Sequence, residues 1–206
     1  MVHNARLPLN LELSIDVDPE NINLVNKLVE IWRSFSSGAH NEGGKQRSLK
    51  LSISIGDDAN AEEKVRECHT ALETIISNNR DIMTTSLSIK KLPSIEASDA
   101  YSGLANCCDS VTIDDESVGK NKNVKLINSL VSAKTLNLTV DSLDSSFAET
   151  IPDTLQTIEL KVGSYDIPSI KLPLSLRKLR LDAREVPEIL NVEELTNLTE
   201  ATICCL

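Results

Sequence analysis

A short pattern recurs along this chain at nearly constant spacing, and it constrains the fold more strongly than any other feature. Residues 151–160 (Ile-Pro-Asp-Thr-Leu-Gln-Thr-Ile-Glu-Leu) match residues 172–181 (Leu-Pro-Leu-Ser-Leu-Arg-Lys-Leu-Arg-Leu), 21 residues further on. Residues 198–203 repeat the second half of the pattern, and so do three earlier segments. The central aliphatic positions of the six units are Leu87, Val111, Leu136, Ile158, Leu179 and Ala201. Their intervals of 24, 25, 22, 21 and 22 residues predict a repeat protein.

Each unit contains aliphatic residues at alternate positions, which is typical of a short β-strand with one buried face. The same alternation occurs earlier, at residues 11–15 and 51–55, so about eight strands are expected. A single unit cannot bury its apolar edge alone, and neighbouring units therefore stack and share a continuous core. Stacked units place their strands side by side in one parallel sheet, about 4.8 Å apart.

This pattern resembles that of the leucine-rich repeat family, whose consensus is Leu-x-x-Leu-x-Leu-x-x-Asn-x-Leu at 20 to 29 residues. The resemblance covers about residues 84–206, with longer strand–helix units over residues 1–83, all within one domain. It implies an α/β fold, a leucine-rich repeat solenoid curved into an arc, with the parallel sheet on the concave face and helices or turns on the convex face. The asparagine position of the family is occupied here by Leu92, Glu116, Asp141, Gly163 and Arg184. The turns are therefore expected to satisfy their backbone polar groups by other means.

Two helices are predicted between the early strands. The first begins at Asp18 as N-cap, with Pro19 in the first turn, where its missing N–H has no helical partner. Its apolar residues, spaced three or four apart, are Ile22, Val25, Leu28, Val29, Trp32 and Phe35. The second begins with Asn60 and Glu63 as a capping box. Its apolar residues are Val65, Cys68, Leu72, Ile75 and Ile76.

Two further segments are assigned from their composition. A third, shorter helix is expected at about residues 124–131, where aliphatic residues again recur at helical spacing. Residues 36–47 contain three glycines and are expected to form an exposed loop.

Composition and charge exclude several classes of protein. The 206 residues are 40% hydrophobic, which is too apolar for a disordered chain, and only 2% aromatic, which fits thin layers of similar aliphatic residues. The net charge of −10 repels phosphate backbones and anionic lipid, so neither nucleic acid nor a membrane surface is expected as a partner. No apolar run is long enough to span a bilayer, and the first residues do not form a secretory signal.

Five cysteines occur as two adjacent pairs and a singlet, which is not a disulfide framework. Reduced thiols packed as small apolar side chains indicate an intracellular protein, cytoplasmic or nuclear.

The candidate catalytic motifs all fail on geometry. Cys68 and His69 are consecutive on a predicted helix, so they point about 100° apart. Residues 43–46 lack the first glycine and the final Ser or Thr of a phosphate loop, and a strand follows them. The acidic runs at 57–58 and 114–116 lack the spacing of a calcium loop. We therefore expect no enzyme activity, no metal site and no cofactor.

The remaining candidate site is the concave face of the sheet, where residues between the core aliphatics point outward. Its residues are Ser88, Lys90, Thr112, Asp114, Asn137, Thr139, Glu159, Lys161, Arg180 and Asp182. A non-enzymatic module that binds another protein through this face is the preferred hypothesis.

The alternative is a structural subunit or an incomplete repeat fragment that another chain completes. It arises because residues 201–206 read as a strand whose outer edge is apolar, which favours self-association through that edge. Since repeats similar to these often follow an F-box, the family resemblance also implies a possible role in a ubiquitin-ligase adaptor.

Overall fold

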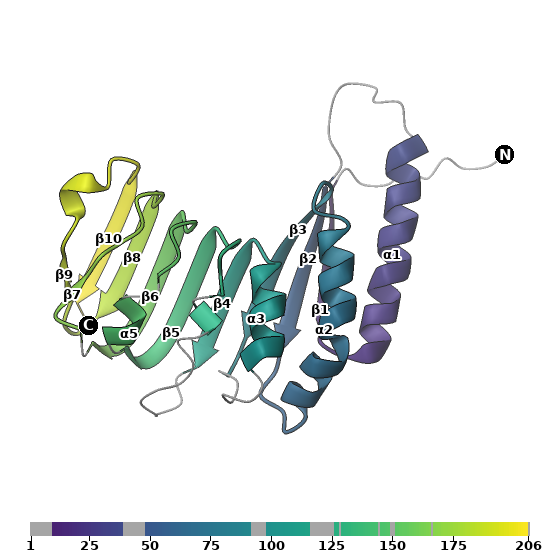
Figure 1. The fold of residues 1–206 in the computed structure, drawn as a ribbon, viewed down its shortest axis with the longest axis horizontal. Coiled ribbons are helices and arrows are strands. Elements are labelled where there is room, and N and C mark those ends of the chain that lie inside the picture. Colours follow the sequence, from purple (N-terminus) through teal and green to yellow (C-terminus); the bar gives the residue numbers. More distant parts are fainter. Residues whose placement is uncertain are drawn as a thin grey trace.

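The computed structural model describes residues 10–38, 48–91, 98–115, 126–127, 129–143, 145–148, 151–165 and 167–205. Within them the chain forms one eight-stranded sheet in the order β1-β2-β3-β4-β5-β6-β8-β10 (Figure 1). The strands are β1 (Asn10–Asp16), β2 (Ser48–Ile55), β3 (Met83–Ile89), β4 (Ser110–Asp115), β5 (Thr135–Leu143), β6 (Thr157–Tyr165), β8 (Lys178–Ala183) and β10 (Glu200–Cys205). All neighbouring strands are parallel, which confirms the predicted α/β fold with its parallel sheet. The sheet is open, since β1 and β10 lie at its two opposite edges (Figure 1).

The connections between the strands run over one face of the sheet. The helices are α1 (Pro19–Gly38), α2 (Ala61–Ser77), α3 (Ser98–Asn106), α5 (Ser145–Ala148) and the 3₁₀ turn η2 (Val192–Glu194). Figure 1 shows α1, α2 and α3 side by side on this face. Towards β10 the connections become thinner, and β7 (Ser169–Ile170) pairs with β9 (Glu188–Ile189). Among the described residues, no helix is both long and apolar enough to cross a membrane.

The first two helices confirm most of the predicted side-chain pattern. The N–H of Glu20 donates to Asp18 Oδ1 at 3.0 Å, so Asp18 caps α1 as expected. Asn60 precedes α2, but its side chain makes no capping hydrogen bond, so the predicted capping box is wrong. Instead, Asp58 Oδ1 accepts a hydrogen bond from the Asn60 N–H at 2.8 Å. This bond stabilises the turn that leads into the helix.

The apolar faces of both helices are buried. On α1 the buried residues are Ile22, Val25, Val29 and Trp32, while Leu28 is half-buried. The side chain of Phe35 lies outside the described residues. On α2 all five predicted apolar residues are buried. α1 extends to Gly38, three residues into the segment predicted as a loop, and residues 39–47 lie outside the described part.

One helix was not expected from the sequence. α3 has nine residues, of which Tyr101, Leu104 and Ala105 are buried, and it packs against α2. Of the third predicted helix, only Leu126 and Ile127 are helical among the described residues, and both are buried.

The core consists of rows of aliphatic side chains that cross the sheet from strand to strand. One row follows the central positions of the repeats, and each of its inner members is at most 3% exposed. Its inner members are Ile53, Leu87, Val111, Leu136, Ile158 and Leu179. The row ends on β10 at Ala201, which is exposed.

The recurring proline motif forms the same tight turn in both of its copies. The N–H of Leu155 donates to the Pro152 carbonyl at 3.3 Å, and the N–H of Leu176 donates to the Pro173 carbonyl at 3.1 Å. Side chains also satisfy backbone groups between layers. Asp109 Oδ2, for example, accepts from the Thr85 N–H at 3.0 Å.

Candidate binding surface

The face of the sheet opposite the helices carries polar side chains because successive residues of a strand point to opposite sides. On β5, Leu136 and Leu138 are buried towards the helices, whereas Asn137 and Thr139, which alternate with them, are partly exposed. The same alternation runs along β4 and β8. We call this side of the sheet the polar face.

The strand register brings nine of the ten predicted site residues together on the polar face. They form two adjacent rows, with neighbours in a row about 4.8 Å apart. The first row contains Ser88, Thr112, Asn137, Glu159 and Arg180. The second row contains Asp114, Thr139, Lys161 and Asp182. The tenth residue, Lys90, follows the end of β3 and lines a different hollow.

Charges alternate in sign where β6 and β8 meet. Glu159 lies opposite Arg180, and Lys161 lies opposite Asp182. Arg180 Nε and Nη2 each lie 3.0 Å from Asp182 Oδ2, and this hydrogen-bonded pair raises the pKa of Arg180. The Asp182 side chain is only 15% exposed, against 54% for Arg180. The guanidinium thus covers the carboxylate while remaining open to a partner.

A hollow of about 210 Å³ lies over this part of the polar face. Its polar lining comes from Asn137, Thr139, Glu159, Lys161, Arg180 and Asp182. Asn137 Nδ2 donates to Thr112 Oγ1 at 3.3 Å, but Asn137 Oδ1 is buried and has no hydrogen-bond partner within the described part of the chain. Asp182 Oδ1 likewise has no nitrogen or oxygen donor among the described residues.

The polar face also carries a row of hydroxyl groups that the sequence did not lead us to include. The row contains Ser14, Ser52, Ser86, Ser110, Thr135 and Thr157. Within it, Ser86 Oγ donates to Ser52 Oγ at 3.0 Å. The signal was present as serines at alternate positions of β2 and β3, between the core aliphatics.

A second, larger hollow of about 560 Å³ lies where β1 and β2 end and the helices begin. Its charged lining comes from Asp16, Asp18, Glu20, Asp58, Lys64 and Lys90. Lys64 Nζ lies 3.5 Å from Asp58 Oδ2, so part of this charge is already paired. No group of three or more His, Cys, Asp or Glu side chains in the described ranges is arranged to hold a metal ion. The acids at or shortly after the ends of β1 and β2 were the signal for this hollow.

The local surroundings of Cys68 do not favour a nucleophile. Cys68 is buried on α2, and burial first, then the charges of Asp18 and Glu67, raises the pKa of its thiol. The thiol therefore stays protonated near neutral pH. The neighbouring His69 Nε2 lies 3.5 Å from Glu73 on the same helix. The glycine-rich segment at 43–46 lies outside the described residues.

The two rows of the polar face therefore combine charges of both signs, hydroxyl and amide groups and a shallow hollow on one open surface. Such a surface suits hydrogen bonds and charge pairs with a partner of complementary pattern. No protein-family model, curated protein or solved structure matches this chain.

Proposed function

We propose that this chain is a non-enzymatic module of the leucine-rich repeat type that binds another protein across its polar face. In this proposal the stacked units form a curved solenoid, with the polar face on its concave side. The single observation that supports the proposal most directly is the pair of rows that surrounds the 210 Å³ hollow. The helices α1 to α3 lie on the other face of the sheet (Figure 1).

The chemistry of the rows indicates the kind of partner. The charged centre holds Glu159, Lys161, Arg180 and Asp182 in a pattern without a dominant sign, so the partner surface should carry charges of both signs. The rows contain no aromatic side chain of the kind that dominates tight interfaces. The complex should therefore depend on many polar contacts and dissociate readily. A nucleic acid is a poor ligand for a chain of net charge −10.

The test is capture of partners from a cell extract, followed by an affinity measurement with each purified candidate. The polar-face variant reverses three charges, as Asp114→Lys, Lys161→Glu and Arg180→Glu. We expect it to weaken the binding of a true partner by at least about tenfold, because several complementary pairs become repulsive.

The matched control variant changes the net charge equally on the helical side of the molecule, as Lys27→Glu, Glu30→Lys and Arg66→Glu. All three of these residues are exposed on α1 or α2. The control should retain the affinity of the unmodified chain. Equal affinity of the polar-face variant and the unmodified chain for every captured partner would refute the proposal.

The same proposal places the module in a reducing compartment, cytoplasmic or nuclear. Five free cysteines support it, of which Cys68, Cys107 and Cys108 are buried among apolar residues. Burial is the main cause that raises the pKa of the Cys108 thiol, which makes this cysteine suited to packing rather than to redox chemistry.

A further inference from the structure

The strand β10 lies at one edge of the described sheet. Among the described residues, β10 pairs only with β8, so one side of its backbone has no neighbouring strand. The N–H of Glu200 donates to the carbonyl of Arg177 on the β8 side. Since backbone groups alternate in direction along a strand, those of Ala201, Ile203 and Cys205 point to the free edge.

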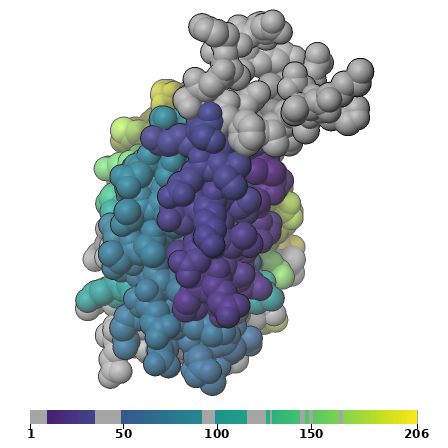
Figure 2. All heavy atoms as spheres, turned by 90° about the vertical axis from the view of Figure 1, so that its right-hand side faces the viewer, coloured from purple at the N-terminus to yellow at the C-terminus, as the bar shows by residue number. Residues whose placement is uncertain are grey.

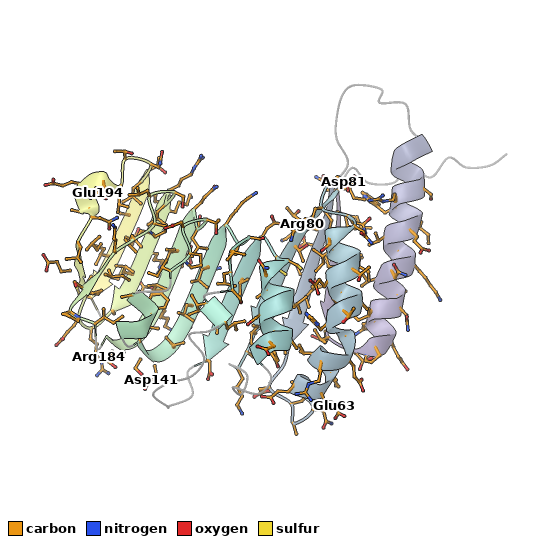
Figure 3. The ribbon with its side chains drawn as sticks, in the orientation of Figure 1. Glu63, Arg80, Asp81, Asp141, Arg184 and Glu194 are labelled. Carbon is orange, nitrogen blue, oxygen red and sulfur yellow. The ribbon has the colours of Figure 1, made fainter. Side chains whose placement is uncertain are left out.

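The side chains of these three residues also lack the cover that the other strands have. Ala201, Ile203 and Cys205 continue the buried rows of Leu179, Leu181 and Ala183. All three are exposed, and Ile203 is 51% exposed, whereas Leu181 beside it is 1% exposed. Leu190 and Val192 of the last connection are exposed as well, at 61% and 59%. The apolar core is therefore open at this end, which Glu194 of η2 marks in Figure 3.

We propose that a second copy of this chain covers the open end, through antiparallel pairing of β10 with β10 of the other copy about a two-fold axis. A two-fold axis joins identical surfaces and closes the assembly as a dimer. It also removes both free β10 edges at once, which natural sheets otherwise have to protect.

Head-to-tail pairing of β10 with β1 fits less well because the two ends of the molecule differ in thickness. Beside β1 stands α1, a helix of 20 residues, and Figure 2 shows it forming the surface at that end. Beside β10 the connection contains only the two-residue strand β9 and the three-residue turn η2. Head-to-tail joining would set the helix α1 of one copy beside the thin connection of the other, whereas the two-fold arrangement pairs layers of equal thickness.

The charge pattern of β10 selects one register for the pairing. Residues directly opposite each other in an antiparallel pair have side chains on the same face of the sheet. Because side chains alternate between the faces, opposed residues of two identical strands differ by an even number of positions. The two-fold axis therefore passes through a residue and not between two residues. With the axis at Ile203, the opposed residues are Ala201 with Cys205, Thr202 with Cys204, and Ile203 with itself. All of these are uncharged, and Glu200 stays outside the paired stretch. An axis at Thr202 would instead place Glu200 opposite Cys204 and leave Cys205 unpaired.

The first experiment measures molecular mass by sedimentation across a concentration series, in reducing buffer with enough salt to screen the net charge of −10. We expect a concentration-dependent equilibrium between monomer and dimer. Ile203→Lys should raise the dissociation constant at least tenfold. Ile31→Lys is the matched control, because Ile31 on α1 is also 51% exposed and lies near the opposite end.

The second experiment determines the register of the pairing between the two β10 strands. In a Cys205→Ser chain, Thr202→Cys should form a disulfide with Cys204 of the other copy under mild oxidation, because non-hydrogen-bonded antiparallel pairs have Cα atoms about 4.5 Å apart. Adding Cys204→Ser should abolish the covalent dimer.

Three results would overturn the inference. The first is a monomer at every concentration. The second is a loss of association in Ile31→Lys as well as in Ile203→Lys, which would indicate head-to-tail association. The third is a covalent dimer that still forms after Cys204→Ser is added. If β10 instead bound only a different protein, the purified chain would remain a monomer at every concentration, which is the first of these results.

Discussion

Asn191 forms two hydrogen bonds with the backbone of Leu172, and both residues are buried. The Leu172 N–H donates to Asn191 Oδ1 at 3.0 Å, and Asn191 Nδ2 donates to the Leu172 carbonyl at 2.8 Å. One amide side chain thus satisfies the donor and the acceptor of a residue 19 positions earlier, in the preceding layer. This pair is one of the means by which side chains satisfy buried backbone polar groups between layers.

Asn191→Ala should lower the free energy of unfolding markedly. It leaves the buried N–H and carbonyl of Leu172 without partners, which costs about 2–4 kcal/mol for the two groups together. Urea titration followed by circular dichroism measures this loss. Asn197→Ala is the control, since Asn197 is exposed and donates a single bond to the Leu174 carbonyl at 3.0 Å. It should cost no more than about 1 kcal/mol, and equal losses for the two variants would contradict the argument.

Gly163→Ala should destabilise the contact between β5 and β6. A Cβ atom at Gly163 would lie 2.7 Å from the Asp141 carbonyl oxygen, a backbone atom that cannot turn away. Separating the two strands locally should cost about 1–3 kcal/mol. Gly56→Ala tests the explanation, because no atom lies within 4 Å of a Cβ placed there. Thermal unfolding of Gly56→Ala should be close to that of the unmodified chain.

The sheet was predictable from the sequence because its register follows the repeat. Val111 and Leu136 occupy the same position of successive units, and the fold places them opposite each other in the core. Fixing one face of each strand also fixes the other face, so the positions of Asn137 and Glu159 on the polar face followed without further information.

What the sequence did not predict depends on contacts between distant segments. α3 is stabilised by packing on α2, and Gly103 approaches His69 so closely that a Cβ at Gly103 would overlap the imidazole. Four apolar residues in a nine-residue segment, two of them alanines, give too weak a periodicity to reveal such a contact. The alternation of apolar and polar residues places Lys90 on the polar face, because this pattern does not show that β3 ends at Ile89.

Leu181→Ala and Ile203→Ala should differ greatly although the two residues are neighbours in one row. Leu181 is 1% exposed, so its truncation leaves a cavity and costs about 2–5 kcal/mol. Ile203 is half exposed at the edge, and its truncation should cost less than about 1 kcal/mol in a dilute monomer. Chemical unfolding at low protein concentration makes the comparison. A large loss for Ile203→Ala under these conditions would mean that residue 203 is already covered within one chain.

The reactivity of Cys204 should depend on Asp182. A hydrogen bond to the Asp182 carboxylate stabilises the neutral thiol and is the main cause that raises the pKa of Cys204, while the charge of Arg180 lowers it. Asp182→Asn removes the negative charge and should shift the pKa of Cys204 down, so that the thiolate forms at lower pH. In a Cys205→Ser chain, the rate of alkylation of Cys204, followed by mass spectrometry across pH 7 to 10, should rise at lower pH in the variant than in the parent.

Asp114→Asn is the control for this titration, because it removes the same charge from the same row of the polar face at a distance of three strands. It should leave the alkylation profile of Cys204 unchanged. If both variants shifted the profile equally, the general negative potential of the chain, rather than the contact with Asp182, would control the thiol. If neither variant shifted the alkylation profile, the Asp182 carboxylate would not be hydrogen-bonded to the Cys204 thiol in solution. Asp182 would then be paired with Arg180 alone.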